Sequence, residues 1–137
     1  MKKTKNSYRS TGRVALYLLL IIFLCSCSNL VVENIHPAPF TGPTRIIKAT
    51  VKNKGWKAAP ASTTSVEKAP NPSGPYTQVT AVATPPLNSG EEKELMLIPY
   101  REDCIHLKVC ADINDDVNEG WFGGEGNNCT LKSIGCQ

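Results

Sequence analysis

The chain has 137 residues and carries 15 Lys and Arg against 12 Asp and Glu, which gives a formal net charge of +3. Five of the cations stand within the first 13 residues, so the remainder carries 10 cations against 12 acids, a net charge of −2. No basic stripe interleaved with aromatic residues is left in that remainder, and nucleic-acid binding is therefore not among the functions we expect.

The start of the chain is predicted to be an export signal. The run VALYLLLIIFLC, residues 14–25, is uncharged and follows the basic start. A transmembrane helix needs about 20 apolar residues, whereas a basic start followed by a shorter apolar core is typical of a signal peptide. We therefore expect a signal segment over residues 1–27 and a single domain over residues 28–137.

The end of this segment predicts a lipid anchor. Leu24-Cys25-Ser26-Cys27 resembles the bacterial lipobox, in which a leucine and small residues precede a cysteine that receives lipid. Cys27 fits that role better than Cys25, because Ser26 supplies the small residue before it. Two or three acyl chains hold a protein firmly in a membrane. By analogy with enteric lipoproteins, the serine after Cys27 indicates the outer membrane of a bacterial envelope; the alternative is cleavage near this point and a secreted protein.

The rest of the chain alternates between short β-type runs and turns rich in Pro, Gly and Asn, and no helical pattern stands out. In the clearest run, Ile105, Leu107, Val109 and Ala111 share one face. Seven short strands at near-regular spacing predict an all-β, immunoglobulin-like two-sheet sandwich. The stretch between Pro60 and Pro86 is irregular, and its strand bounds stay open. The predicted strands are residues 29–35, 44–53, 63–69, 76–84, 93–100, 104–112 and 129–136.

Four cysteines follow the signal segment, and their number predicts two disulfides. An even number of cysteines in an exported chain is typical of a disulfide framework. Zinc is the alternative, but structural zinc sites use close pairs such as C-x₂-C. The spacings here are six, nineteen and seven, and neither histidine is expected to complete such a site. The four residues are Cys104, Cys110, Cys129 and Cys136.

Strand register selects the pairing of these cysteines. If the last two strands pair antiparallel, opposed residues have a constant index sum, which is 239 for Cys110 with Cys129 and 240 for Cys104 with Cys136. One residue of difference is small enough for a bulge or a frayed end to absorb. A Cys104–Cys110 bridge would have to span about 20 Å of one extended strand, too far for a disulfide. We predict Cys110–Cys129 and Cys104–Cys136.

An acidic stretch separates the last two strands, and it raises the question of calcium. Asp112, Asn114 and Asp116 are spaced like the first ligands of an EF-hand loop. The pattern then fails, because Val117 stands where the turn needs glycine and Gly123 stands where the bidentate Glu is needed. A looser calcium site on Asp112, Asn114 and Asp116 is the weaker alternative to a structural loop without a cofactor.

The same stretch resembles the closing motif of the CARDB family, the cell adhesion related domain found in bacteria, whose pattern is roughly D-x-x-N-x-V-x-E-x-x-E-x-N-N. Asp115 replaces the usual Asn, the segment 121–124 enlarges the loop, and the cysteines are not part of the pattern. The resemblance implies an immunoglobulin-like sandwich, usually a non-catalytic module of surface and secreted proteins with an adhesive or scaffolding role. The matching segments are DINDDVNE (112–119) with EGNN (125–128), LVVENI (30–35), ATVKNKG (49–55) and LNSGEE (87–92).

These observations favour a binding module and not an enzyme. The chain has only two histidines, His36 and His106, and no G-x-S-x-G motif. Trp121 and Phe122 are the candidate partner-binding residues, because aromatic side chains exposed on such loops bind proteins or sugars; the alternative is that both rings pack onto the sandwich. We expect an envelope-anchored binding or adhesion module with an unidentified protein or glycan partner. The alternatives are a passive structural or assembly subunit, and a secreted domain stabilised by calcium.

Overall fold

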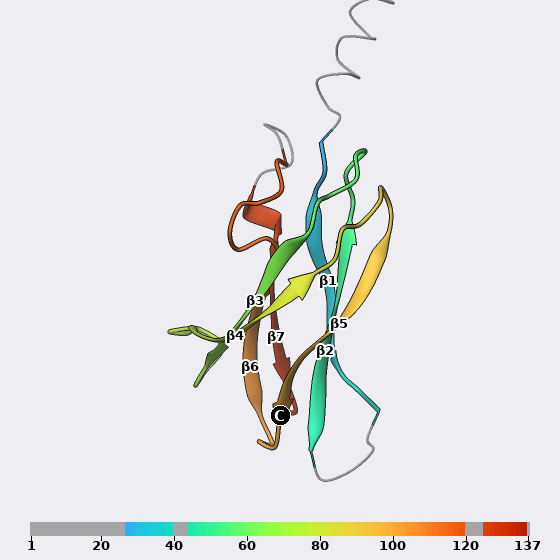
Figure 1. Ribbon diagram of the computed structural model, residues 1–137. Helices are drawn as coiled ribbons and strands as arrows, with labels where there is room; N and C mark the ends of the chain where they lie inside the picture. The colour runs from blue at the N-terminus through green and yellow to red at the C-terminus, as the bar shows by residue number, and fades with distance from the viewer. Residues whose placement is uncertain (1–26, 40–43, 120–124, 137) are drawn as a thin grey trace, which may run out of the picture.

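The computed structural model describes residues 27–39, 44–119 and 125–136, which form seven strands and one short 3-10 helix (Figure 1). The predicted signal segment before Cys27 lies outside the described residues, as do Trp121 and Phe122. Among the described residues, no helix is long and apolar enough to cross a bilayer. The elements are β1 (Leu30–Pro37), β2 (Arg45–Asn53), β3 (Ser62–Ala69), β4 (Thr77–Thr84), β5 (Glu92–Tyr100), β6 (Ile105–Cys110), η1 (Glu125–Asn127) and β7 (Cys129–Ile134).

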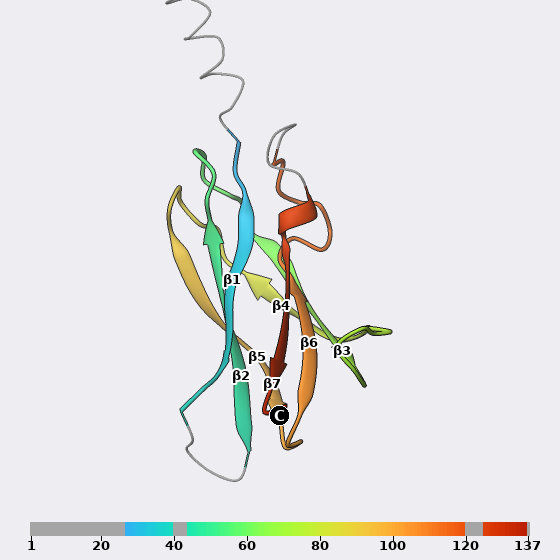
Figure 2. The ribbon, with the colours of Figure 1, turned by 180° about the vertical axis from the view of Figure 1, so that it is seen from behind.

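The strands form two antiparallel sheets that face each other across one core (Figures 1 and 2). One sheet has the order β1-β2-β5 and the other has the order β4-β3-β6-β7. This is the predicted immunoglobulin-like sandwich, and every predicted strand agrees with the observed one to within two residues at each end. The irregular stretch after Pro60 forms β3 and β4, whose hairpin projects away from the body of the sandwich (Figures 1 and 2).

The alternation of the strands explains the core. Successive side chains of a strand point to opposite faces, so alternate residues of β2 and of β6, nearly all of them apolar, turn to the space between the sheets. The faces predicted for both strands are confirmed. Burying one Val, Leu or Ile side chain of this core contributes roughly 1.5–3 kcal/mol to the stability of the fold. The fully or almost fully buried members are Ile47, Ala49 and Val51 of β2, and Ile105, Leu107 and Val109 of β6.

Two disulfides close the β6–β7 hairpin, one at each end. Cys110 and Cys129 are register partners and join with a Cα–Cα distance of 4.0 Å. The Cys104–Cys136 bridge has a Cα–Cα distance of 4.5 Å and lies one residue out of that register. Gly135 absorbs the difference, because its φ of 74° turns the chain and a Cβ there would stand 2.0 Å from the carbonyl oxygen of Asp103. The observed pairing is the one that the index sums predict.

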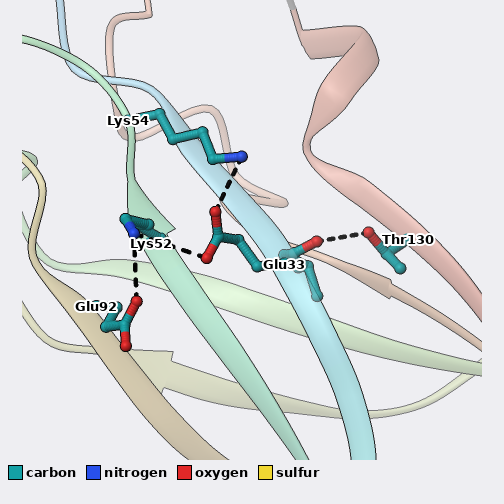
Figure 3. Close-up of polar contacts among 6 residues, drawn as sticks. Glu33, Lys52, Lys54, Glu92 and Thr130 are labelled. Atoms are coloured by element: carbon teal, nitrogen blue, oxygen red, sulfur yellow. Dashed lines mark hydrogen bonds and ion pairs between the residues drawn. The ribbon is translucent and has the colours of Figure 1, made fainter.

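A ladder of charges crosses the three-stranded sheet on its outer face (Figure 3). Glu33 is the extra residue of a bulge in β1. Its carboxylate lies 2.9 Å from Nζ of Lys54 and 3.8 Å from Nζ of Lys52, and Lys52 lies 3.4 Å from the carboxylate of Glu92 on β5. The hydrogen bond from Lys54 lowers the pKa of Glu33 below its ordinary value. Because these groups are exposed, the ladder contributes little to stability.

One side-chain hydrogen bond joins the edges of the two sheets beside this ladder. Thr130 on β7 donates from Oγ1 to the carbonyl oxygen of Val32 on β1, over 2.6 Å (Figure 3). The bond meets β1 at its bulge, where the regular pairing with β2 is interrupted. Both strands lie at sheet edges, so the bond uses a backbone acceptor of an edge strand.

The core assignment makes a direct prediction for two leucines on neighbouring strands. Leu107 on β6 is fully buried, whereas Leu131 on β7 is 59% exposed. We expect Leu107→Ala to lower the free energy of unfolding by about 2–5 kcal/mol, since it leaves a cavity in the core. We expect Leu131→Ala to change it by less than about 0.5 kcal/mol. Chemical denaturation with the disulfides intact measures both, and similar losses in the two variants would contradict the assignment.

Candidate functional site

One end of the sandwich gathers Cys27 and three connections that are distant in sequence: the β2–β3 connection, the β4–β5 turn and the β6–β7 connection (Figures 1 and 2). We call this the Cys27 end. Backbone bonds hold Cys27 itself, because its carbonyl oxygen accepts from the backbone N of Trp56 at 2.8 Å and of Lys57 at 3.3 Å. The residues before β1 are therefore held against the β2–β3 connection.

Asn53 organises the Cys27 end from its centre. Its side chain is fully buried at the end of β2. The amide oxygen accepts from the backbone N of Asn29 at 3.1 Å and of Gly55 at 2.9 Å. The amide nitrogen donates to the carbonyl oxygens of Lys57 at 2.6 Å and Leu87 at 3.0 Å. Both the amide oxygen and the amide nitrogen are satisfied. One side chain therefore joins the segment before β1, the β2–β3 connection and the β4–β5 turn.

Asp112 shapes the acidic stretch by capping it from inside. Its side chain is buried, and its two carboxylate oxygens accept from the backbone N of Asp116 at 3.0 Å and of Val117 at 2.9 Å. Its φ of 54° is left-handed, a conformation that Asp tolerates better than most residues. The resulting tight turn places Val117 in the hydrophobic core. The expectation that acids of this stretch hold a connection in shape is met at Asp112.

The end of the acidic stretch is attached to the first strand. Oε1 of Glu119, a buried residue, accepts from the backbone N of Leu30 at 2.7 Å. Next to it, Oγ of Ser28 donates to the carbonyl oxygen of Asn118 at 3.2 Å. A hydrogen bond to an ionised carboxylate is stronger than one between neutral groups. The family-like motif therefore fastens the segment that follows Cys27.

The three candidate calcium ligands have different surroundings. Asp112 faces inward onto backbone amides, as described above. Asn114 is exposed, and its amide lies 3.4 Å from Oγ1 of Thr63. Asp116 is exposed. Within the described parts of the chain, the acids of this stretch form no group of three His, Cys, Asp or Glu side chains close enough to share an ion.

The sequence reasoning passed over Trp56, which is the most conspicuous side chain of the Cys27 end. Trp56 is 82% exposed and directly follows Gly55. A Cβ on Gly55 would lie 2.3 Å from the carbonyl oxygen of Cys27, so only glycine allows the connection to pack this closely. The sequence signal for Trp56 is an aromatic residue immediately after Gly55, the glycine that ends the family-like segment 49–55.

At the opposite end, His106 lies beside the Cys104–Cys136 disulfide. Its Nε2 is 3.5 Å from Sγ of Cys104 and 3.8 Å from Sγ of Cys136, and its Nδ1 is 2.7 Å from Oγ of Ser133. The expectation that neither histidine is placed to complete a metal site with the cysteines is therefore wrong for the position of His106. Residues two apart on a strand share a face, which brings His106 over Cys104. In the structure the two sulfurs are bonded to each other, so they offer no thiolate to a metal.

Seven antiparallel strands around one core, with polar side chains fastening the connections at one end, define a small immunoglobulin-like module. The chain belongs to the CARDB family, whose model matches residues 27–132. No curated protein matches the chain significantly.

Three solved structures are similar to this chain to different degrees. A CARDB domain from Pyrococcus furiosus, solved in complex with di-metal ions, is 21% identical, with a TM-score of 0.57 over 79% of this chain and 87% of that one. β-Glucosidase 3B from Thermotoga neapolitana, in complex with α-D-glucose, is 16% identical, with a TM-score of 0.48 over 78% of this chain and 16% of the enzyme. A β-glucosidase from Bifidobacterium adolescentis is 14% identical, with a TM-score of 0.47 over 79% of this chain and 17% of the enzyme. The CARDB likeness supports the sandwich and says nothing further about this chain.

The cap at Asp112 predicts a difference between two aspartates of one loop. Asp112→Asn keeps one acceptor oxygen and the tolerance for a left-handed backbone, but loses the second acceptor and the charge. We expect it to lower the free energy of unfolding by about 1–3 kcal/mol. Asp116→Asn, at an exposed side chain, is the matched control and is expected to stay within about 0.5 kcal/mol of the wild type. Chemical denaturation measures both.

Calcium binding by this stretch would give a different result, which can be tested with the wild type and Asp112→Asn. If this stretch were a calcium site, millimolar calcium would raise the Tm of the wild type, and the rise would disappear in Asp112→Asn. We expect no rise, because each carboxylate oxygen of Asp112 already accepts a backbone N–H.

Proposed function

We propose that the protein is an envelope-anchored, non-catalytic binding module held in the membrane by lipid on Cys27. The observation that carries the proposal is the state of Cys27. Its thiol takes part in neither disulfide, and only Ser28 and Asn29 separate it from β1. The four other described cysteines are consumed in pairs, so Cys27 is the sulfur left for modification among the described residues.

The disulfides support the exported location. Disulfides persist in oxidising compartments and are rare where thiols are kept reduced. Two of them clamp one hairpin in this domain of about 110 residues, which fits a module that works outside the cytoplasm. The outer membrane remains the proposed destination, on the strength of Ser28 after the modified cysteine.

The proposal of a non-catalytic module is supported by the surroundings of the histidines. His36 lies on the surface of β1, where its Nε2 is 3.2 Å from the carboxylate of Glu94. A hydrogen bond from Lys48 lowers the pKa of that carboxyl, which keeps Glu94 ionised and unsuited to act as an acid near neutral pH. His106 contacts Ser133 and a disulfide, as described above. Ser133 and His106 form a hydroxyl–imidazole pair, but the other ring nitrogen of His106 faces the disulfide and, among the described residues, no carboxylate that would orient the ring as a catalytic base.

The partner is proposed to be a protein or a glycan outside the cell membrane. Family membership supports an adhesive or scaffolding role, and Trp121 and Phe122, in the connection after Glu119, stay the proposed partner-binding residues. The Pyrococcus furiosus domain carries metal ions, but we do not carry these over, because Asp112 caps backbone amides and the remaining candidate ligands are exposed.

Two neighbouring cysteines provide the test of the anchor. We expect the membrane-extracted protein to carry a diacylglyceryl group on Cys27, visible by mass spectrometry, and to enter the detergent phase on phase separation. Cys27→Ser should abolish both, because the acceptor sulfur is gone. Cys25→Ser, the matched control, should leave both unchanged. A mature chain that is found without lipid, in the aqueous fraction, would contradict the anchor and favour a secreted module.

The open edge at β4 favours a second candidate function, that of an assembly subunit. Edge strands are commonly protected by charges, prolines or covering segments. β5 carries three charged residues and a proline, β1 carries Glu33 and a proline, and β7 carries Lys132, whereas β4 reads TQVTAVAT, without a charge or a proline. Its outward side chains Val79, Ala81 and Ala83 are exposed. An extended segment of another subunit could pair with such an edge.

A charge on this edge tests the assembly role. If β4 pairs with a second strand in the envelope, Ala81→Lys should reduce cross-linking at this edge by about tenfold or more, because a charge opposes strand addition. Met96→Lys is the matched control, since Met96 is 62% exposed on β5, a strand that already carries charges. Cross-linking from photoreactive residues on β4 in intact cells is the measurement. Failure of the wild type to cross-link would remove this candidate.

A further inference from the structure

Trp56 is exposed where the fold gives it no partner of its own. Its residue is 82% exposed, more than any other large hydrophobic residue that the structure describes. Scattered exposed aliphatic residues need no explanation, but a tryptophan offers the largest apolar surface of any side chain together with one N–H donor. That combination suits a boundary between water and an apolar phase.

The place of this ring is tied to the place of the proposed lipid. The backbone N of Trp56 donates to the carbonyl oxygen of Cys27, and Gly55 packs against the backbone of Cys27 and Ser28. Ser89 adds a further bond, donating from Oγ to the carbonyl oxygen of Gly55 at 2.7 Å. The Trp56 backbone and the anchor cysteine are therefore parts of one hydrogen-bonded unit, with no flexible linker between them.

The short tether limits what this end can face. Two residues separate Cys27 from β1, and both are held: Asn29 through its backbone by Lys54 and Asn53, and Ser28 by Asn118. An acyl chain on Cys27 would enter the bilayer within a few ångströms of the sulfur. The Cys27 end would then lie at the lipid headgroups, where tryptophan is enriched in membrane proteins.

Residues near Trp56 in the chain and in the adjoining hollow carry both positive and negative charges. Contact with a membrane at this end would therefore depend on the apolar ring and not on electrostatic attraction. Lys57, the residue after Trp56, is exposed, and it lines a hollow together with Cys27 and the exposed Asp116. Lys54, the other nearby cation, pairs with Glu33. No net positive surface results, so attraction to anionic lipid would be weak.

We propose that the Cys27 end is a membrane-facing surface and that Trp56 inserts its ring into the interface of the bilayer beside the lipid on Cys27. This rests on the proposed lipid anchor, and with this orientation a partner binds away from the β6–β7 connection, which lies at the same end and holds Trp121 and Phe122. The lipid on Cys27 and the ring of Trp56 are then two points of attachment. Two points restrict the tilt of the sandwich relative to the membrane, whereas one point alone would not. The contact depends on the ring, so it forms on neutral and anionic lipid alike.

Fluorescence with brominated lipids tests the insertion. The chain has two tryptophans, so Trp121→Phe leaves Trp56 as the single emitter. The processed full-length protein is reconstituted into phosphatidylcholine vesicles whose acyl chains carry bromine. We expect the emission to shift to the blue and to fall by about twofold or more relative to unbrominated vesicles, as for a ring at the interface. Adding phosphatidylglycerol to the vesicles should change neither result.

Two variants control for position. Arg101→Trp, in the background Trp56→Phe with Trp121→Phe, places the single emitter in the exposed turn at the opposite end, and its emission should stay unquenched. Trp56→Phe with Trp121 retained reports the other tryptophan and separates its contribution. Quenching at Trp56 with none at Arg101→Trp supports the orientation. Equal quenching at both ends would overturn it, since the module would then lie flat or tumble.

The outcomes separate this inference from the anchor itself. A lipid found on Cys27 with Trp56 emission that stays red and unquenched overturns the inference and leaves the anchor standing; the ring is then available to a protein or glycan. A chain without lipid overturns the anchor. In that case the thiol of Cys27 is coupled to a maleimide-bearing lipid in the same vesicles, where quenching of Trp56 supports the membrane-facing surface and its absence overturns it.

Discussion

The structure depends first on the covalent clamping of the β6–β7 hairpin at both of its ends. Cys110–Cys129 holds two residues that oppose each other in the ladder, so β7 cannot slip against β6. A slip of one residue would turn the side chains of β7, including the buried Ile134, to the opposite face. Cys104–Cys136 closes the other end one residue out of register, with Gly135 taking up the difference. Since β6 also pairs with β3, the hairpin sets the register of the four-stranded sheet.

At the Cys27 end, the fold depends on buried polar side chains as well as on the Cys110–Cys129 disulfide. Asn53, Asp112 and Glu119 are all buried: the first two accept backbone N–H groups from connections, and Glu119 accepts the backbone N–H at the start of β1. Such contacts are directional, so they hold the connections in one arrangement where apolar packing alone would allow several. The family-like motif is therefore a set of fastenings, and the side chain most open to a partner among the described residues at this end, Trp56, stands outside it.

The sequence predicted the contacts that local periodicity and covalent geometry control. Alternation located the core faces of β2 and β6, and index sums selected the cysteine pairs, because both rules act within one strand or one hairpin. Contacts that depend on how the sheets pack were missed. Glu119 meets Leu30 across 89 positions of sequence, and no local rule brings them together. Asn53 continues the inward alternation of Ile47, Ala49 and Val51, which signals a buried amide but not its partners. His106 beside Cys104 could have been found, since residues two apart share a face.

The segment between Cys27 and β1 is short, and this limits how far an anchored domain could extend from a membrane. The nine residues of β2 rise by about 3.3 Å each, so the body of the sandwich is about 30 Å long. If an acyl group on Cys27 anchored the domain, this length would also be the greatest height above the bilayer at which its far tip could contact a partner. A partner too large to approach the bilayer that closely would be excluded by size before any side chain could discriminate against it.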